Sequence, residues 1–222
     1  MALTDDLKFL GMTFVVIDFE TLTPAGRPAE PIEVGTVAGR FTPDGQWRES
    51  GRYTALMRPP DDVQVTRFDV AQTGLTERIL RAQRPQAQVM AQLDGRLTAP
   101  PYRLVAHSAQ TEAAVIGGQR QHCPTLAATP LLCTVKLARL AYPQLRSHRL
   151  NELLRHLDIP KPANRHRALP DAELTVGVFQ AVLAAGTAAY TWATLRDLDL
   201  AAGVYVTPDR AGDTDAQQVM LF

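Results

Sequence analysis

The first part of the chain alternates short apolar runs with turn residues, a pattern typical of β-strands joined by tight connections. Residues 14–17 form a short apolar run rich in β-branched side chains, so we predict a buried strand there. Residues 32–41 and 51–57 are predicted to be two further strands, because the Pro-Asp-Gly at 43–45 between them is a turn signal. Three strands with short connections predict an antiparallel meander.

From residue 75 onward the apolar positions follow helical spacing. Leu75, Ile79 and Leu80 fall on one helix face, and a second such set follows the helix-breaking Pro85. We predict further helices from about residue 111 and over 136–141, 150–157 and 171–185, with short buried strands at 104–106 and 131–133. This order predicts an α/β fold with a mixed five-stranded sheet, three antiparallel strands followed by two parallel ones, flanked by helices.

The end of the chain differs in composition from the rest. Residues 207–216 are polar and contain Pro and Gly without a large apolar side chain, which predicts a flexible linker. Residues 217–222 then form a partly apolar terminus. We therefore predict a flexible tail over 207–222, preceded by a helical extension over 187–206.

Charge and cysteine usage narrow the functional classes. Lys plus Arg and Asp plus Glu both number 23, which argues against nucleic-acid binding driven by a large basic surface, so any such contact is expected to be short, local and partly metal-mediated. No apolar run approaches the roughly 20 residues of a membrane span, and the N-terminus does not resemble a secretory signal. Cys123 and Cys133 have no metal-type spacing, so we expect reduced thiols in a cytoplasmic protein without a membrane partner.

Two carboxylates follow the first predicted strand. Alternation along a strand places Asp18 and Glu20 on one face, while Phe19 points into the core. Adjacent carboxylates repel unless a cation lies near them, and residues 10–25 contain neither Lys nor Arg. A bound divalent metal is the simplest remaining counter-charge.

Three separated motifs resemble those of the DnaQ-like, or DEDDh, family of 3′–5′ exonucleases, which includes the proofreading subunit of bacterial replicative polymerases. The motifs are Val16-Ile17-Asp18-Phe19-Glu20-Thr21, Val105-Ala106-His107-Ser108 through Glu112, and His166-Arg167-Ala168-Leu169-Pro170-Asp171-Ala172. Residues 73–76 and 133–139 also resemble connecting segments of the family. The resemblance covers about residues 12–186, leaving 1–11 as an N-terminal extension, and it implies a ribonuclease H-like sheet.

The resemblance also implies a site and a reaction. Asp18, Glu20, Glu112 and Asp171 are the expected ligands of two Mg²⁺ or Mn²⁺ ions, and oxygen ligands suit such hard cations. His166 is the expected general base, because an imidazole can accept a proton from water near neutral pH. The expected substrate is a single-stranded or frayed 3′ end of DNA, in proofreading or repair. An exoribonuclease that trims RNA 3′ ends is the alternative enzyme.

The second motif departs from the family pattern. The family normally has Asn after the residue matching His107 and Phe-Asp where this chain has Thr111-Glu112. Glu is longer than Asp by one carbon–carbon bond, roughly 1.5 Å. Glu112 therefore coordinates with a small shift of its helix or through water, or else the site is weakened and the protein only binds 3′ ends or a sliding clamp. We expect His107 to support the turn after its strand rather than to catalyse.

The last five residues resemble the Gln-x-x-Leu-Phe peptide by which bacterial proteins dock on the sliding clamp. Gln218 would fix the register, and Leu221 and Phe222 would enter an apolar pocket. The alternative is that these apolar residues fold back on the domain. The resemblance names a sliding clamp and a DNA polymerase as expected partners.

Overall fold

The computed structural model describes residues 2–162, 166–189 and 191–207. Its strands are β1 (Thr13–Leu22), β2 (Glu30–Phe41), β3 (Trp47–Leu56), β4 (Tyr102–Ala106), β5 (Leu131–Cys133) and β6 (Gly203–Val204). Its helices are η1 (Leu3–Asp5), α1 (Leu7–Leu10), α2 (Arg67–Thr73), α3 (Glu77–Arg81), α4 (Gln86–Asp94), α5 (Gln110–Gly118), α6 (Pro124–Ala128), α7 (Thr134–Ala141), α8 (Leu150–His156), α9 (Ala168–Ala188) and α10 (Leu195–Ala202).

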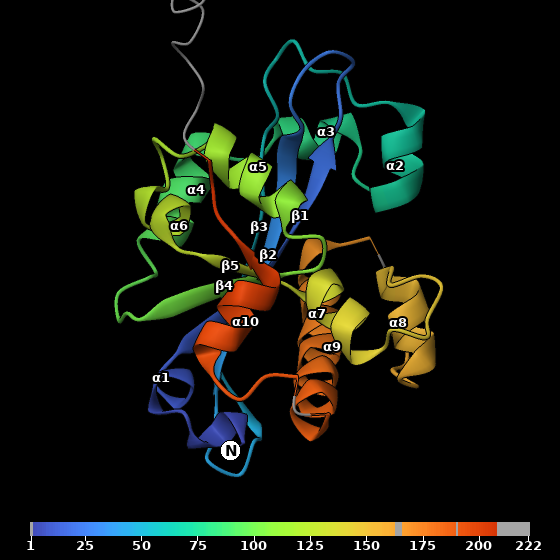
Figure 1. Cartoon of the computed structure of the whole chain (residues 1–222). Helices are drawn as coiled ribbons and strands as arrows, with labels where there is room; N and C mark the ends of the chain where they lie inside the picture. Colours follow the sequence, from blue (N-terminus) through green and yellow to red (C-terminus); the bar gives the residue numbers. More distant parts are fainter. Residues whose placement is uncertain (1, 163–165, 190, 208–222) are drawn as a thin grey trace, which may run out of the picture.

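Within these residues six strands form one mixed sheet in the order β3-β2-β1-β4-β5-β6 (Figure 1). β1 pairs antiparallel with β2, and β2 with β3, which confirms the predicted meander. β4 and β5 run parallel to β1, with Val16 opposite Val105 and Ala106 opposite Cys133. The fold class is as predicted, and the sheet has one strand more than the five expected.

The added strand is β6, which pairs antiparallel with β5 and has only two residues. So short a segment has no periodicity that a sequence pattern can reveal. It lies in the stretch expected to be purely helical, after α10. The Cys123 and Cys133 thiols are both free and buried, as expected.

Helices cover both faces of the sheet, with α7, α8 and α9 on one side and α4, α5 and α6 on the other (Figure 1). Phe14 and Val16 of β1 pack toward α9, whereas Val15, Ile17 and Phe19 pack toward the other layer. Period-two alternation therefore sorts β1 cleanly between two cores.

An aromatic cluster fastens α9 to the sheet. The rings of Phe14 and Phe179 lie 5.4 Å apart, and Phe41 lies 5.1 Å from Phe9 of α1. Each buried aromatic contributes roughly 1.5–3 kcal/mol of transfer free energy. α9 is long and apolar enough to span a membrane, but more than half of its most apolar window is buried against the rest of the protein. We read it as the central core helix of this fold.

Candidate active site

The carboxylates of β1 lie on the face that α9 covers. Because Phe14 and Val16 face α9, the same alternation places Asp18 and Glu20 on that side, near the carboxyl end of the strand. Glu20 is buried and Asp18 is half-buried, while Phe19 packs into the opposite core as expected. The strand therefore delivers two acids to the point where α9 begins.

The N-terminus of α9 reaches this point because Gly35 makes room for it. Gly35 lies opposite Asp18 in the β1–β2 ladder. A Cβ added at Gly35 would lie 2.2 Å from the backbone nitrogen of Leu169, well inside van der Waals contact. The absence of a side chain thus lets α9 pack directly on β2. Asp171, in the first turn of α9, is buried as a result.

An ion pair between buried Glu33 and half-buried Arg167 holds the same helix end. Glu33 of β2 is 2% exposed and accepts hydrogen bonds from Arg167 Nε at 2.8 Å and Nη2 at 2.9 Å. The backbone N–H of Ala168 also donates to Glu33, at 3.3 Å. Glu33 is paired with Glu20 across the ladder, so this clamp lies next to the site.

Arg167 changes the electrostatic argument made from the sequence. The hydrogen-bonded Glu33 carboxylate raises the pKa of Arg167, and the charge of Glu20 raises it further. A cation from a distant segment therefore acts on Glu20, which the absence of Lys and Arg in residues 10–25 did not reveal. A bound metal is not the only counter-charge available to the carboxylates.

The structure brings Glu20, His166 and Asp171 together. Each offers a ligand atom, and these atoms all lie within 4.8 Å of one another. His166 is exposed and has a φ of 64°, in the left-handed region that is uncommon for a residue with a side chain. Such backbone conformations cluster at functional sites. Asp18 and Glu112 are outside this three-residue group.

Glu112 approaches from the other helical layer, in the first turn of α5. Its side chain is buried, and burial raises its pKa to about 8. Its Oε2 atom makes no hydrogen bond within the part of the chain that the structure describes. A buried carboxylate oxygen that accepts no hydrogen bond suits a hard divalent cation, which takes oxygen ligands.

His107 has a structural position. Its Nδ1 lies 2.9 Å from the hydroxyl of Thr134, which is itself 3.4 Å from the carbonyl of Ala106. The ring thereby links the end of β4 to the start of α7. This contact agrees with the expectation that His107 supports the turn.

An open cleft of about 720 Å³ adjoins the cluster. Glu20 lines it together with the end of β1, the loop after β1, residues 62–64 and α2. Phe68 of α2 is 74% exposed on its wall. Sequence reasoning missed α2, although Thr66 and Asp69 form a capping box around its first turn.

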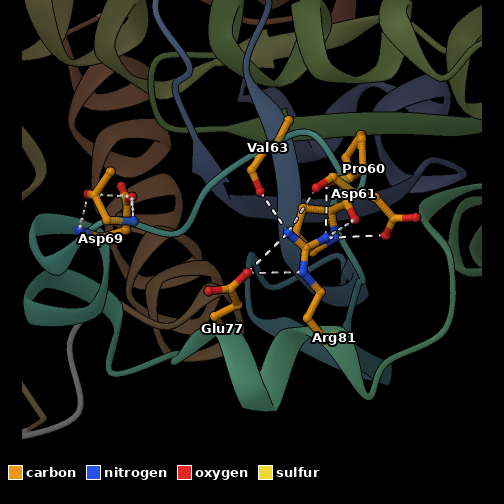
Figure 2. Close-up of polar contacts among 8 residues, drawn as sticks. Pro60, Asp61, Val63, Asp69, Glu77 and Arg81 are labelled. Atoms are coloured by element: carbon orange, nitrogen blue, oxygen red, sulfur yellow. Dashed lines mark hydrogen bonds and ion pairs between the residues drawn. The ribbon is translucent and has the colours of Figure 1, made fainter.

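Arg81 holds the wall of this cleft in place (Figure 2). Its guanidinium donates to the carbonyl oxygens of Pro60 at 3.0 Å and Val63 at 2.9 Å, and it pairs with Glu77 at 3.3 Å. One arginine thus satisfies several loop carbonyls that no strand or helix serves. The loop that lines the cleft is ordered by these bonds.

Comparison with known proteins agrees with the sequence motifs. The RNase T family model, described as Exonuclease, matches residues 15–179. The PolC-type DNA polymerase III of Oceanobacillus iheyensis is 32% identical over 164 residues, covering 73% of this chain and 11% of that protein. The PolC-type enzyme of Thermotoga maritima is 30% identical over 178 residues, covering 80% and 12%. This chain therefore spans about one ninth of the length of these relatives.

Solved structures share the fold. The nuclease domain of 3′hExo, a DEDDh family member bound to rAMP, has a TM-score of 0.67 at 18% identity, covering 82% of this chain and 96% of that one. E. coli exonuclease I in complex with a dT13 oligonucleotide has a TM-score of 0.67 at 17% identity, covering 81% and 42%. The fold and the family match together define an exonuclease. The chain belongs to the exonuclease family matched above, as one of its DEDDh-type members.

Gln218, Leu221 and Phe222, the residues that resemble a clamp-binding peptide, lie outside the described residues.

Proposed function

We propose that this chain removes nucleotides from DNA 3′ ends, in proofreading or repair. The observation that carries the proposal is the grouping of Glu20, His166 and Asp171, of which Glu20 lines an open cleft. Glu20 lies about 146 positions before His166 and Asp171, so the fold and not the local sequence brings it to them. The match to PolC-type DNA polymerases favours DNA over RNA.

In this proposal Asp18, Glu20, Glu112 and Asp171 hold two Mg²⁺ or Mn²⁺ ions. Bound ions would supply Lewis-acid stabilisation of the attacking and leaving oxygens of the phosphodiester. Glu112 must lose its proton to serve as a ligand, and its buried position makes that loss unfavourable without a cation. The Glu33–Arg167 pair fixes the start of α9, and with it the position of Asp171.

His166 acts as the general base. It is exposed, so water can reach it, and a ring nitrogen lies within 4.8 Å of a carboxylate oxygen of Glu20 and of Asp171. An imidazole there accepts the proton of the attacking water, and the neighbouring carboxylates stabilise the imidazolium that forms. Removing a general base costs roughly 10²–10⁴-fold in rate.

An exoribonuclease remains the second candidate, because the matched solved structures include 3′hExo bound to rAMP. The same fold and acid set would serve both substrates. The two candidates differ only in which polymer the protein digests faster. A catalytically weakened protein that holds 3′ ends is the third candidate, and Glu112 in place of Asp is the feature that favours it.

A labelled-oligonucleotide assay tests these readings. We expect the full chain to shorten 5′-labelled DNA from its 3′ end with Mg²⁺ or Mn²⁺, faster than RNA of the same sequence, and to stop in EDTA. Asp171→Asn should lose nearly all activity, whereas His166→Ala should lose roughly 10²–10⁴-fold while still binding Mn²⁺. An inactive wild type that still binds 3′ ends would favour the third candidate, and full activity in Asp171→Asn would overturn the site.

We also propose that Gln218, Leu221 and Phe222 dock on a sliding clamp, and that a DNA polymerase is a further partner. The proposal rests on the likeness of the last five residues to the clamp-binding peptide and on the PolC-type relatives.

A further inference from the structure

The chain is neutral as a whole, but its charge is unevenly placed. Residues 113–151 contain no Asp or Glu and carry five basic residues. They are Arg120, Lys136, Arg139, Arg146 and Arg149. A stretch of this length without one acid concentrates positive charge on the part of the surface that it forms. None of the proposed metal ligands lies within this stretch, although Glu112 immediately precedes it.

Three of these arginines line one pocket of about 330 Å³. The remaining lining residues are Ser108, Val135, Ser147 and His148. Arg139, Arg146 and Arg149 are all exposed. None of the three forms an ion pair with a carboxylate in the part of the chain that the structure describes. Three like charges around one hollow repel each other, and an anion in the hollow relieves that repulsion.

Arg139 lies in α7, and the loop after it, which carries Arg146 and Arg149, is held by hydrogen bonds. His148 Nε2 and the backbone N–H of Leu145 both contact the carbonyl of Tyr142, at 3.0 and 3.1 Å. The hydroxyl of Tyr142 donates to the carbonyl of Ala181 on α9, at 3.2 Å. The segment between α7 and α8 is thus anchored on the core helix, so its side chains are presented from a fixed backbone.

The pocket lies at the same edge of the sheet as the carboxylates. Ser108 lies two residues after the end of β4, and Val135 lies two residues after the end of β5, in the first turn of α7. β1, β4 and β5 are neighbouring parallel strands, so their carboxyl ends share an edge with Glu20. Two strand spacings separate the ends of β1 and β5, which is roughly 10 Å. A single strand of nucleic acid can extend over that distance.

We propose that this pocket binds a backbone phosphate of the substrate, on the 5′ side of the bond that is cut. The inference rests on the proposed function, in which the last nucleotide occupies the cleft by Glu20 and the rest of the strand continues in the 5′ direction. Guanidinium groups bind phosphate oxygens through paired N–H donors, and the hydroxyls of Ser108 and Ser147 add neutral donors. In a chain with no net charge, such a local basic pocket would supply the positive charge that binds the phosphate.

The test compares a long substrate with one that has no upstream phosphate. The full chain and the double variant Arg146→Gln, Arg149→Gln are assayed with a single-stranded thymidine oligonucleotide and with the p-nitrophenyl ester of thymidine 5′-monophosphate. We expect the variant's KM for the oligonucleotide to rise about tenfold, with its kcat near the wild-type value. The wild-type preference for the oligonucleotide over the ester should fall by the same factor.

Salt dependence gives a second readout. Loss of the one phosphate that the pocket neutralises should make the slope of log affinity against log salt less negative by about 0.7, since single strands release roughly 0.7 counterion per neutralised phosphate. Arg196→Gln is the matched control, because Arg196 is also exposed but does not line the pocket. It lies on α10, and the backbone N–H of the preceding residue, Leu195, donates a hydrogen bond to Asp6, which precedes β1. The control should match wild type in KM and in slope.

Each outcome decides between the two proposals. Unchanged KM and salt slope in the double variant, with an active wild type, would overturn the phosphate pocket. Equal losses on both substrates would also overturn it, because the arginines would then act through the fold or the chemistry. If wild type cuts neither substrate, the nuclease proposal fails, and fluorescence anisotropy with labelled oligonucleotide then decides the pocket by the same comparison of affinity and slope.

Discussion

At the scale of single residues, burial sets what each acid of the site can do. Glu20, Glu112 and Asp171 are all buried, yet their surroundings differ. Glu20 lies in the field of Arg167, whereas desolvation dominates at Glu112 and raises its pKa to about 8. Without a cation, Glu112 therefore carries a proton at neutral pH. We expect Glu112 to be protonated in the metal-free protein and ionised when a cation is bound.

This difference predicts a pH effect on the stability of the metal-free protein. The pKa of Glu112 is about 8 when folded, against an ordinary value of 4.5. Between these values the folded protein holds a proton that the unfolded chain has released, so stability falls as pH rises. We expect the melting temperature in EDTA to fall from pH 5.5 to 8.5, and Glu112→Gln to flatten that fall.

The control is Asp61→Asn, because the side chain of Asp61 is 99% exposed. It should keep the wild-type pH dependence. Equal slopes in wild type and Glu112→Gln would show that Glu112 ionises without penalty in the folded protein. Adding Mn²⁺ should raise the wild-type melting temperature most at high pH, where ligand deprotonation costs least.

At the scale of elements, the site depends on how closely the start of α9 approaches β2. Gly35 permits the contact and Glu33 fastens it through Arg167 and Ala168. Helix N-termini need partners for their free N–H groups, and Glu33 provides one from a neighbouring strand. The first turn of α9, with Asp171, therefore keeps its position relative to Glu20.

Gly35→Ala should disturb this contact. The new Cβ would meet backbone atoms of Leu169 and Ala168 at 2.2–2.3 Å, which cannot be relieved by rotating a side chain. We expect a loss of roughly 1–3 kcal/mol in the free energy of unfolding, with weaker Mn²⁺ binding and lower nuclease activity. Urea unfolding and metal titration measure the two effects.

Gly51→Ala is a matched control in the same sheet. Gly51 lies in β3, and an added Cβ there meets nothing within 4 Å. This variant should keep wild-type metal affinity and activity. If Gly35→Ala also keeps both, the close approach of α9 to β2 does not position the site.

At the scale of the whole molecule, the sequence predicts the strands of the sheet better than the side-chain contacts between the sheet and the helices packed on it. Local alternation placed Asp18 and Glu20 on one face, and the family motifs supplied Asp171 and His166. The Arg167–Glu33 pair joins residues 134 positions apart, and no local pattern reveals such a contact. One signal was available, because Glu33 is a charged residue next to Ile32 and Val34 inside a predicted strand.

The tail supplies a prediction at the same scale. Removing residues 217–222 should leave digestion of short oligonucleotides unchanged, because the proposed site contains none of them. It should abolish clamp binding and clamp-stimulated digestion of long DNA, since tethering acts through effective concentration. Pull-down with a bacterial sliding clamp and a timed digest of long DNA measure both.

Gln217→Ala, just outside the five-residue motif, should leave clamp binding intact, whereas Leu221→Ala with Phe222→Ala should abolish it. A lower melting temperature after truncation, with no clamp binding by wild type, would instead indicate that the apolar residues pack on the domain.

The two edges of the sheet are closed in different ways. β3 has β2 on only one side, and most of its residues are exposed, including Arg48, Glu49 and Arg52. A register shift in the β2–β3 ladder interrupts this edge further, and β6 covers only part of the other. Charges and an irregular ladder hinder another chain from adding a strand. The protein can therefore reach high concentration without its sheets joining edge to edge.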